Sequence, residues 1–246
     1  MNRSRAALSL TLLLAGCSYS EELGRRQLLL IDDASLAQAA AQGWQQTLKT
    51  GRVSQDNAAN THVRTVANRI ISAAGLANQP WEIVVFDDAS ANAFVLPGRR
   101  MGVNTGLLRV VQNDDQLAAV IGHEVAHSVA QHAAERYSQT AATQLTLGVA
   151  TGVAGDSRIG DVLGAYGGAG AQLGVLLPFS RRHELEADRL GVEYMQRAGY
   201  QPREAIELWR RMSEGRTGGQ FEIASTHPSD ATRIQELERY ISQRGW

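Results

Sequence analysis

Apolar side chains recur at the spacing of an amphipathic helix over much of the chain. In residues 58–75, for example, Val63, Val66 and Ile70 fall on one face of a helix with 3.6 residues per turn. Asn113, with Gln116 three residues later, is a suitable N-cap for a long helix, and Pro202 suits a helix start. The stretches that predict helices are 35–50, 58–75, about 114–137, 181–198, 202–214 and about 229–243.

Three shorter stretches between the second and third of these helices have the pattern of strands. Residues 81–88, 92–98 and 101–108 are rich in β-branched and aromatic side chains, and Pro97-Gly98 separates the last two. The last two stretches therefore predict a hairpin. Together with the helices they predict a mainly α protein with a small sheet of three or four strands, of the α+β class.

Composition and charge are those of an ordinary globular protein. The 246 residues are 43% hydrophobic and 20% charged, with a formal net charge of −1, so no excess of positive charge points to a nucleic-acid partner. Residues 148–178 are unusually rich in glycine and alanine. A membrane hairpin is one interpretation, but Asp156, Arg158 and Asp161 interrupt the apolar run. We therefore expect a small-residue helical segment with loops, which covers a cleft.

The first residues have the composition of an export signal. Arg3 and Arg5 precede an apolar core that is too short to span a bilayer, and small residues lead to Cys17, the only cysteine. This pattern resembles the lipobox of bacterial lipoproteins, in which the cysteine is lipidated. The alternative is an ordinary secretory signal with an incidental cysteine.

The lipobox resemblance implies a division of the chain into three parts. Residues 1–16 would be a lipoprotein signal peptide, residues 17–34 the lipidated Cys17 with a tether, and residues 35–246 one folded domain. Ser18, rather than an aspartate, follows the cysteine. By resemblance to lipoprotein sorting in enteric bacteria, this favours the outer membrane, with the domain facing the periplasm and the acyl chains as its anchor.

The pattern H-E-x-x-H at His123, Glu124 and His127 is the strongest chemical signal in the chain. Residues four apart lie on one face of a helix, so both imidazoles can bind one metal ion, and Glu124 at the edge of that face can reach a water molecule. A chance motif in a histidine-rich helix is the alternative. The opposite side of the helix has an apolar row suited to a core, which consists of Leu117, Ile121, Val125 and Val129.

His132 is predicted to lie outside this site. It comes five positions after His127 and is therefore rotated off the metal face of a continuous helix, so we expect a solvated side chain. The metzincin variant of the motif would also need glycine at position 130 and histidine at position 133, where this chain has Ala130 and Ala133. That subtype is excluded.

A third ligand is expected in residues 181–191. Glu184 and Asp188 are four apart in a predicted helix, so Glu184 could bind zinc while Asp188 accepts a hydrogen bond from a ligand histidine. The alternative is a solvated helix face with charged pairs. His183 is a weaker candidate, because adjacent residues project about 100° apart on a helix.

These motifs, taken in order, resemble the zinc metallopeptidase family of the CAAX prenyl protease, HtpX and the mitochondrial stress peptidases of that type. Within it, the chain looks most like the periplasmic lipoprotein branch of LoiP and the BepA catalytic domain. The resemblance covers nearly the whole chain after Cys17. The segments that carry it are "GRRQLLL" (24–30), "NAFVLPGRRMGVNTGLL" (92–108), H-E-x-x-H, the E-x-E-A-D of residues 184–188 and "THPSDATRIQEL" (226–237).

The resemblance implies a role for each matched residue. Residues 35–246 would form a gluzincin-type zinc metallopeptidase domain. The zinc ligands would be His123, His127 and Glu184, the catalytic residues Glu124 and His227, and the outer partners Asp188 and Arg233. His227 would stabilise the transition state or bind zinc as a fourth ligand, or it is a capping or core histidine before Pro228. Arg233 would order that segment. The residues of the strand expected to bind substrate by β-addition are Asn92, Ala93, Phe94 and Val95.

We therefore expect a metalloendopeptidase of the bacterial cell envelope with one Zn²⁺ per chain. It would degrade misfolded or unassembled periplasmic and outer-membrane proteins, with unfolded polypeptides as substrates, the membrane as its anchor and envelope-protein assembly factors as further partners. A chaperone-like lipoprotein that binds clients beside a latent zinc site is the alternative from another class. Glu124 favours the enzyme, because a structural zinc site has no need of it. A zinc hydrolase that acts on peptidoglycan peptides is a third interpretation, and it is less favoured because the sequence shows no recognisable cell-wall-binding module.

Overall fold

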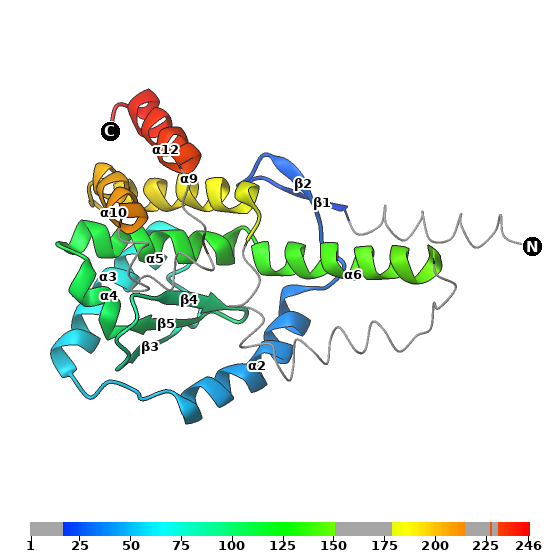
Figure 1. Cartoon of the computed structure of the whole chain (residues 1–246), viewed down its shortest axis with the longest axis horizontal. Coiled ribbons are helices and arrows are strands. Elements are labelled where there is room, and N and C mark those ends of the chain that lie inside the picture. The colour runs from blue at the N-terminus through cyan, green and yellow to red at the C-terminus, as the bar shows by residue number, and fades with distance from the viewer. Residues whose placement is uncertain (1–16, 151–178, 215–226, 228–230) are drawn as a thin grey trace, which may run out of the picture.

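The computed structural model describes residues 17–150, 179–214, 227 and 231–246 (Figure 1). Helices dominate this part of the chain, which confirms the mainly α, α+β prediction, and the Asn113 side chain caps the helix that follows it, as predicted. The elements are β1 (Cys17–Ser20), β2 (Arg25–Leu28), α2 (Asp33–Thr50), α3 (Asn57–Ala73), β3 (Glu82–Phe86), β4 (Ala93–Leu96), β5 (Arg100–Asn104), α4 (Thr105–Val110), α5 (Asp114–Val129), α6 (His132–Ala150), α9 (Arg181–Arg197), α10 (Arg203–Glu214) and α12 (Ala231–Arg244).

The larger sheet has the strand order β3-β5-β4. β4 and β5 pair in antiparallel register, with Ala93 opposite Val103, so the predicted hairpin is confirmed. β3 lies parallel to β5 on its other side. This order makes β4 an edge strand of the sheet, within the described residues.

β5 is shorter than the predicted strand 101–108. It ends at Asn104, and α4 begins at the next residue. The chain turns here because the Thr105 hydroxyl and the Gly106 amide both donate to the carbonyl of Asp88. Gly106 fits closely in this turn, since a Cβ there would lie 2.2 Å from the carbonyl oxygen of Ala89.

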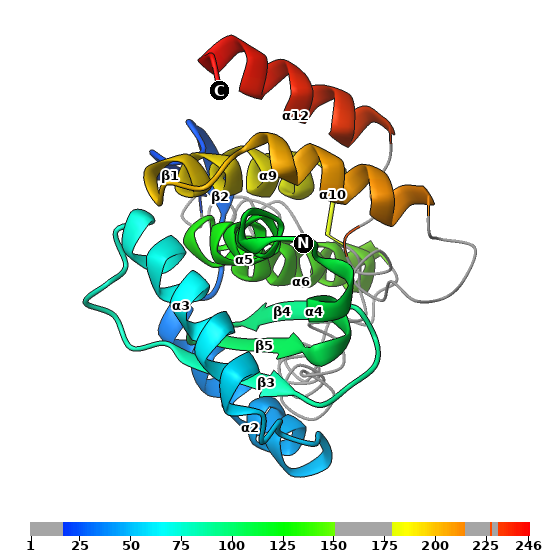
Figure 2. The same ribbon diagram turned by 90° about the vertical axis from the view of Figure 1, so that its left-hand side faces the viewer.

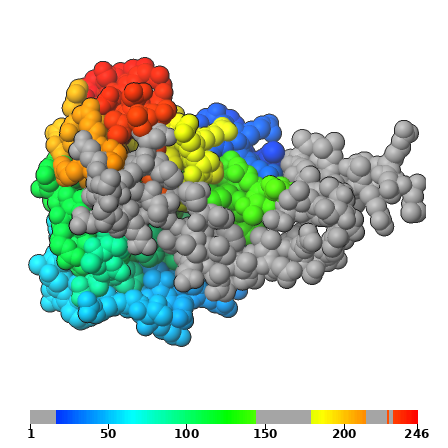
Figure 3. Space-filling model, in the orientation of Figure 1, coloured from blue at the N-terminus to red at the C-terminus, as the bar shows by residue number. Residues whose placement is uncertain are grey.

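The sheet, α5 and the pair α9 and α10 form successive layers (Figure 2). α3 contributes its predicted apolar face to the main core. A second cluster forms where Trp44 of α2 packs edge-on against Phe86 and Phe94, at 6.1 and 6.3 Å between ring centroids. On the surface, α10 and α12 lie at the opposite end of the molecule from α2 and α3 (Figure 3). α5, the helix with the H-E-x-x-H motif, therefore lies between the sheet and the pair α9 and α10.

α5 and α9 approach each other closely where Gly122 meets Gly191. A Cβ on Gly122 would lie 2.9 Å from the Gly191 carbonyl oxygen, and one on Gly191 would lie 3.0 Å from the backbone nitrogen of His123. Because the nearest atoms are backbone atoms, no side chain can move aside to make room. His123 follows Gly122 directly, and Asp188 lies about one turn before Gly191, so this contact brings the histidine-bearing helix and the acidic helix together.

We expect Gly122→Ala to destabilise the protein by about 1–3 kcal/mol, as overpacking of a core does. Alanine alone would stabilise a helix by up to about 1 kcal/mol relative to glycine, so the two effects oppose each other. The steric effect should win, because the helices must separate to admit the methyl group. Urea denaturation of both proteins measures the difference. A gain in unfolding free energy would contradict the close backbone contact.

The predicted helix 114–137 is wrong at its C-terminal end, because α5 stops at Val129 and α6 starts at His132. Between them, Gln131 has a left-handed backbone with φ of 51°, which costs a residue with a side chain on the order of 1–2 kcal/mol. The side-chain amide of Gln27 donates to the carbonyl of Ala130 at 2.8 Å, an acceptor that the helix end would leave open. A distant residue therefore stabilises the break, which contains no glycine or proline.

Residues 17–28 form an antiparallel hairpin of β1 and β2, which corrects the expectation of a tether over residues 17–34. Gln27 is buried, and its amide also donates to Glu135. Arg25 forms ion pairs with Glu135 of α6 and Glu186 of α9, at 2.7 and 2.6 Å. The hairpin packs on the domain because these two polar side chains have buried or half-buried partners there.

The stability contributed by Glu135 is expected to depend on pH. Burial raises the pKa of this carboxyl, but the hydrogen bonds from His183 and Arg25 outweigh burial and hold the pKa below its ordinary value of 4.5. Such a group stabilises the fold fully above about pH 4.5, and its contribution is lost as the pH falls below that value. Glu135→Gln should therefore cost roughly 3 kcal/mol at neutral pH, the order found for a broken buried ion pair.

Urea denaturation of wild type and Glu135→Gln, from neutral pH down to about pH 3, tests this linkage. The difference in unfolding free energy between the two proteins should shrink once the pH falls below about 4.5. A difference that stays constant over the whole range would show that the charge of Glu135 adds no stability.

Two expectations concern residues outside the described part of the chain. These are the signal peptide at residues 1–16 and the glycine- and alanine-rich segment, of which residues 151–178 are not described. Among the described residues, no helix combines the length and the apolar character needed to cross a bilayer.

Candidate metal centre

His123, His127, Glu184 and His227 converge on one buried point. One potential ligand atom from each lies within 4.8 Å of the other three. All four side chains are buried. α5 supplies two histidines one turn apart, α9 supplies Glu184, and His227 precedes α12 in the chain. The structure thus brings together the residues that the sequence analysis proposed as ligands, and His227 with them.

The two histidines of α5 turn the same ring nitrogen, Nε2, toward this point. The two Nε2 atoms are 3.1 Å apart, and Nε2 of His123 is 3.1 Å from Nδ1 of His227. The Nδ1 atoms point outward to different partners, which are Asp188 for His123 and His132 for His127, each at 2.9 Å. Metal-binding histidines typically have one nitrogen on the metal and the other in a hydrogen bond.

Asp188 is held in turn by Arg233 of α12. Nε and Nη2 of Arg233 donate to the two carboxylate oxygens of Asp188 at 2.8 and 2.7 Å. Nη1 lies 2.7 Å from Oε2 of Glu184 and donates to the backbone carbonyl of His227 at 3.3 Å. One guanidinium therefore contacts both acidic residues of α9 and the segment of His227, which is the contact that an ordering role for Arg233 requires.

The two α5 histidines differ in proton affinity. Burial lowers the pKa of His123, but its hydrogen bonds with Asp188 and Glu184 outweigh burial and raise the pKa to about 9. Burial and the charge of His123 lower the pKa of His127 well below its ordinary value. The difference arises because the outer nitrogen of His123 contacts a carboxylate, whereas that of His127 contacts another imidazole.

Glu124 lies beside the four-residue group. Burial raises the pKa of its carboxyl, against the charges of His227 and His123. Its Oε1 is 3.4 Å from Nε2 of His227 and has no hydrogen-bond partner among the described residues. A raised pKa moves a carboxylate toward the pH at which a general base works best.

His227 sits between the two carboxylates of the site. Its Nδ1 is 3.0 Å from Oε1 of Glu184, and its Nε2 faces Glu124. The side chain is therefore close enough to complete a metal site as a fourth ligand, or to donate a hydrogen bond to a substrate bound beside Glu124.

His132 is not solvated, contrary to the prediction. It is fully buried, and its Nδ1 contacts ligand candidate His127. The prediction assumed a continuous helix, whereas the break at Gln131 turns the chain and returns His132 toward the site. His132 still lies outside the four-residue group, so the exclusion of the metzincin pattern is unaffected.

Two aromatic residues of the site were not found by the sequence analysis. The ring of Phe179 stacks on His127 with 4.1 Å between centroids, and also on His227 at 5.4 Å. Trp209 of α10 lies edge-on to His123 at 5.4 Å. These rings restrict the rotation of the imidazoles. No local pattern marks them, because an aromatic residue before or within a helix is usually part of the core.

The predicted substrate-binding segment, residues 92–95, lies next to Glu124. β4 is the strand nearest α5 (Figure 2), and the backbone amide of Val95 lowers the pKa of Glu124. The side chains of Asn92 and Ala93 are buried, and those of Phe94 and Val95 are half-buried. Any contact of substrate with this segment would therefore involve mainly the backbone of the strand.

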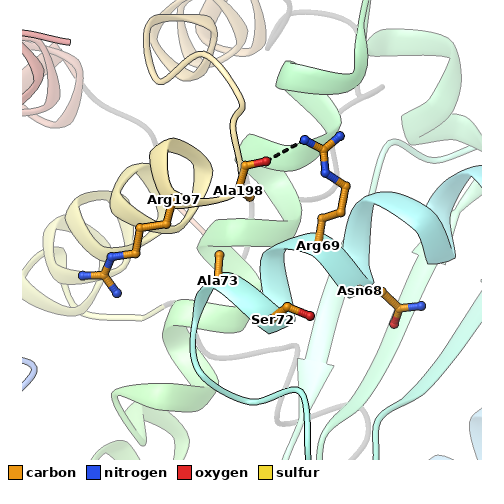
Figure 4. Close-up of a pocket in the computed structure, with 6 residues that line it drawn as sticks. All are labelled: Asn68, Arg69, Ser72, Ala73, Arg197 and Ala198. Carbon is orange, nitrogen blue, oxygen red and sulfur yellow. Dashed lines mark hydrogen bonds between the residues drawn. The ribbon is translucent and has the colours of Figure 1, made fainter.

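A pocket of about 480 Å³ between α3 and the end of α9 offers no comparable chemistry (Figure 4). Arg69 in this pocket donates to the carbonyl of Ala198 at 2.6 Å and lies over the ring of Tyr200. Arg197 pairs with Glu193. Both arginines are thus engaged in contacts of the fold, and no residue of the four-residue group lines this pocket.

The four-residue group fits a zinc ion. Imidazole nitrogens with one carboxylate oxygen are typical zinc ligands, and zinc prefers four of them. Nε2 of His123 lies 3.1 Å from both Nε2 of His127 and Nδ1 of His227, and a shared cation would satisfy the lone pairs of all three nitrogens at once. Glu124 lies at the edge of the group, and its Oε1 is unpartnered within the described part of the chain, so this carboxylate is placed to act on a molecule bound there.

Comparison with known proteins agrees with this geometry. The model of peptidase family M48 matches residues 57–241, a region that includes the whole group. The mitochondrial metalloendopeptidase OMA1 of Schizosaccharomyces pombe is 39% identical over 184 residues, which cover 74% of this chain and 53% of that protein. Human metalloendopeptidase OMA1 is 28% identical over 235 residues, which cover 89% of this chain and 45% of that protein.

A bacterial relative is also similar. The β-barrel assembly-enhancing protease of Escherichia coli K12 is 26% identical over 194 residues, which cover 74% of this chain and 39% of that protein. The chain thus spans about half, or less, of the length of these curated relatives.

Proposed function

Because the chain belongs to peptidase family M48, a family of metalloendopeptidases, we propose that it is a zinc-dependent endopeptidase that cleaves unfolded polypeptides. One observation carries the proposal. Glu124 places a buried carboxylate beside the group that contains His123, His127 and Glu184, and its Oε1 has no hydrogen-bond partner among the described residues. A purely structural metal site has no use for this carboxylate, whereas peptide hydrolysis needs a base.

His123, His127 and Glu184 would hold the ion, with His227 near the remaining position. Zinc bound there would supply Lewis-acid chemistry, by polarising the scissile carbonyl and lowering the pKa of the attacking water. Glu124 accepts the proton of that water and passes it to the leaving amine. His227 donates a hydrogen bond to the oxygen on which negative charge develops.

The edge position of β4 supports an extended substrate. A polypeptide that pairs with this strand would present its backbone next to Glu124. Main-chain pairing requires an unfolded segment and depends little on side chains. The proposed substrates are therefore unfolded or misfolded chains rather than one defined sequence.

Hydrolysis of casein by the purified full-length chain tests the proposal. The chain is stripped with a chelator, reloaded with zinc and assayed, together with a measurement of bound zinc. We expect one zinc per chain, hydrolysis that depends on zinc, and no hydrolysis of a folded, disulfide-stabilised protein. Absence of a stoichiometric zinc ion would rule out the proposed site.

His227 supports a second candidate, a client-binding protein with a latent zinc site. If His227 is the fourth ligand, the site is closed and the chain binds casein without cutting it. The same assay separates the two functions when casein binding is measured beside hydrolysis. His227→Ala then decides between them further, since it would start hydrolysis in a latent site but lower it in an active one.

We also propose that the protein acts in the bacterial cell envelope, lipidated at Cys17 and anchored in the outer membrane facing the periplasm. The support is the composition around the exposed Cys17 and the similarity to a protein named a β-barrel assembly-enhancing protease. Placement within the branch of LoiP and BepA, in the family of the CAAX prenyl protease and HtpX, belongs to this proposal. Misfolded or unassembled periplasmic and outer-membrane proteins would be its substrates, and envelope-protein assembly factors its partners.

Fractionation of cells that express wild type or Cys17→Ser tests the location. Wild type should sediment with outer membranes and incorporate a labelled fatty acid, and Cys17→Ser should do neither. Equal distribution of the two proteins would contradict the lipid anchor without affecting the proposed chemistry.

A further inference from the structure

His132 connects ligand candidate His127 to charged side chains that the proposed reaction does not use. Its Nδ1 is 2.9 Å from Nδ1 of His127, and its Nε2 is 3.1 Å from Oε2 of Glu186. His183 stacks on one face of the ring, with 4.4 Å between centroids. The imidazole of His132 is thus fixed at both ring nitrogens and on one face.

The hydrogen bonds along this path can run in only one direction. Both oxygens of Glu186 accept hydrogen bonds from Arg25, so this carboxylate is an acceptor toward His132 as well. His132 must then donate from Nε2, and a neutral imidazole that carries its proton on Nε2 accepts at Nδ1. His127 therefore donates from Nδ1, and the lone pair of its Nε2 is directed at the metal group.

Strand β2 fixes the far end of this path. Arg25 donates to both oxygens of Glu186, each at 2.6 Å, and to both oxygens of Glu135. Two positions later, Gln27 donates to Ala130 in the turn that brings His132 back onto His127. Strand β2 thus fixes two things: the carboxylate of Glu186, which orients the ring of His132, and the turn after α5, which brings His132 next to His127.

We infer that strand β2 contributes to the metal site. Arg25 and Gln27 fix the position of His132, and His132 is a positioning residue that holds His127 in the tautomer required for metal binding. This inference rests on the proposed function, because its main consequence is zinc affinity. The two histidines of α5 are then oriented by different means. Asp188 orients His123 directly, whereas a neutral imidazole that depends on the N-terminal hairpin orients His127.

Three variants of the full chain alter the path at two residues, His132 and Arg25. His132→Phe keeps a flat ring and removes both nitrogens. Arg25→Met removes the guanidinium but keeps the length of the side chain, and Arg25→Lys keeps the charge without the fork that bridges two carboxylates. Arg52→Met is the matched control, because Arg52 pairs with Asp87 at an exposed site.

The first readout is the zinc dissociation constant, measured at neutral pH by competition with a fluorescent chelator. We expect His132→Phe to bind zinc about 10- to 100-fold more weakly, the range found when the outer partner of a ligand is removed. Arg25→Met should bind about tenfold more weakly, Arg25→Lys should fall between it and wild type, and Arg52→Met should equal wild type. Val63→Ala, a core truncation in α3, controls for lost stability and should leave zinc affinity unchanged.

The second readout needs no metal. Imidazole nitrogen NMR spectra of the metal-free chain should show His132 as the Nε2–H form and His127 as the Nδ1–H form, and Arg25→Met should give mixtures of tautomers. Wild-type zinc affinity and tautomers in Arg25→Met would overturn the inference, as would an equal loss of affinity in Val63→Ala. If wild type binds no zinc, the proposed function fails and the nitrogen spectra alone decide the inference.

Discussion

Glu124→Gln is expected to lower the rate of casein hydrolysis by about 100- to 10,000-fold, the range that a general base contributes. The amide has the shape of the carboxylate but cannot accept the proton of the attacking water. Zinc binding should be unchanged, because Glu124 is not a member of the four-residue group. Stability should be equal or higher, since the variant no longer buries a carboxylate oxygen that lacks a partner among the described residues.

The measurement is kcat with saturating casein, with zinc content and urea denaturation determined on the same preparations. Glu207→Gln on α10 is the matched control, because its carboxylate is exposed and pairs with Arg210 at the surface. A variant that keeps its zinc and cleaves at the wild-type rate would remove Glu124 from the mechanism. Loss of zinc from Glu124→Gln would instead place Glu124 among the ligands.

Glu184→Gln is expected to weaken zinc binding by more than about 100-fold, which exceeds the usual effect of removing an outer partner of a ligand. The carboxylate is the only acidic member of the group, and the charges of His227 and Arg233 help to lower its pKa well below the ordinary value although burial raises it. An amide lacks the charge that attracts a divalent cation. It also leaves Arg233 with one anionic partner fewer in a buried position.

Zinc content after dialysis and chelator competition measure this effect, and near-ultraviolet circular dichroism shows whether the fold persists. Glu193→Gln is the matched control, because Glu193 lies on the same helix and pairs with Arg197 and Arg244 outside the site. Stoichiometric zinc of wild-type affinity in a folded Glu184→Gln chain would show that the third ligand lies elsewhere.

The parts of the site that could be predicted from sequence are those that depend on helix geometry alone. The four-residue spacing of His123 and His127 places both rings on one face wherever the helix lies. The same spacing places Glu184 and Asp188 on one face of α9, where Glu184 contacts His227 within the group and Asp188 contacts the outer nitrogen of His123. No tertiary information was needed for either pair. His227 was found only by resemblance to a family, because nothing around it repeats at a helical spacing.

The parts that could not be predicted depend on contacts between distant segments. Gln27, about a hundred residues earlier in the chain, stabilises the end of α5. Its side chain binds the carbonyl of Ala130, next to the unfavourable left-handed backbone of Gln131. Without that contact the local pattern favours a longer helix and a solvated His132. The hairpin was missed for the same reason, since Arg25 and Gln27 appear as ordinary polar residues until their partners on α6 and α9 are known.

The Gly122–Gly191 contact also has a consequence for the order of events during biosynthesis. His123 and His127 are on one helix, but His123 and His227 are 104 residues apart, and the acidic group comes from the far side of the glycine contact. A nascent chain therefore cannot assemble the centre around a local segment as a zinc finger does, and the four groups meet only after α9 has docked on α5. A copy in which α9 has not docked on α5 lacks Glu184 at the centre. Under the proposed function, hydrolysis thus begins only in chains in which α9 has docked on α5.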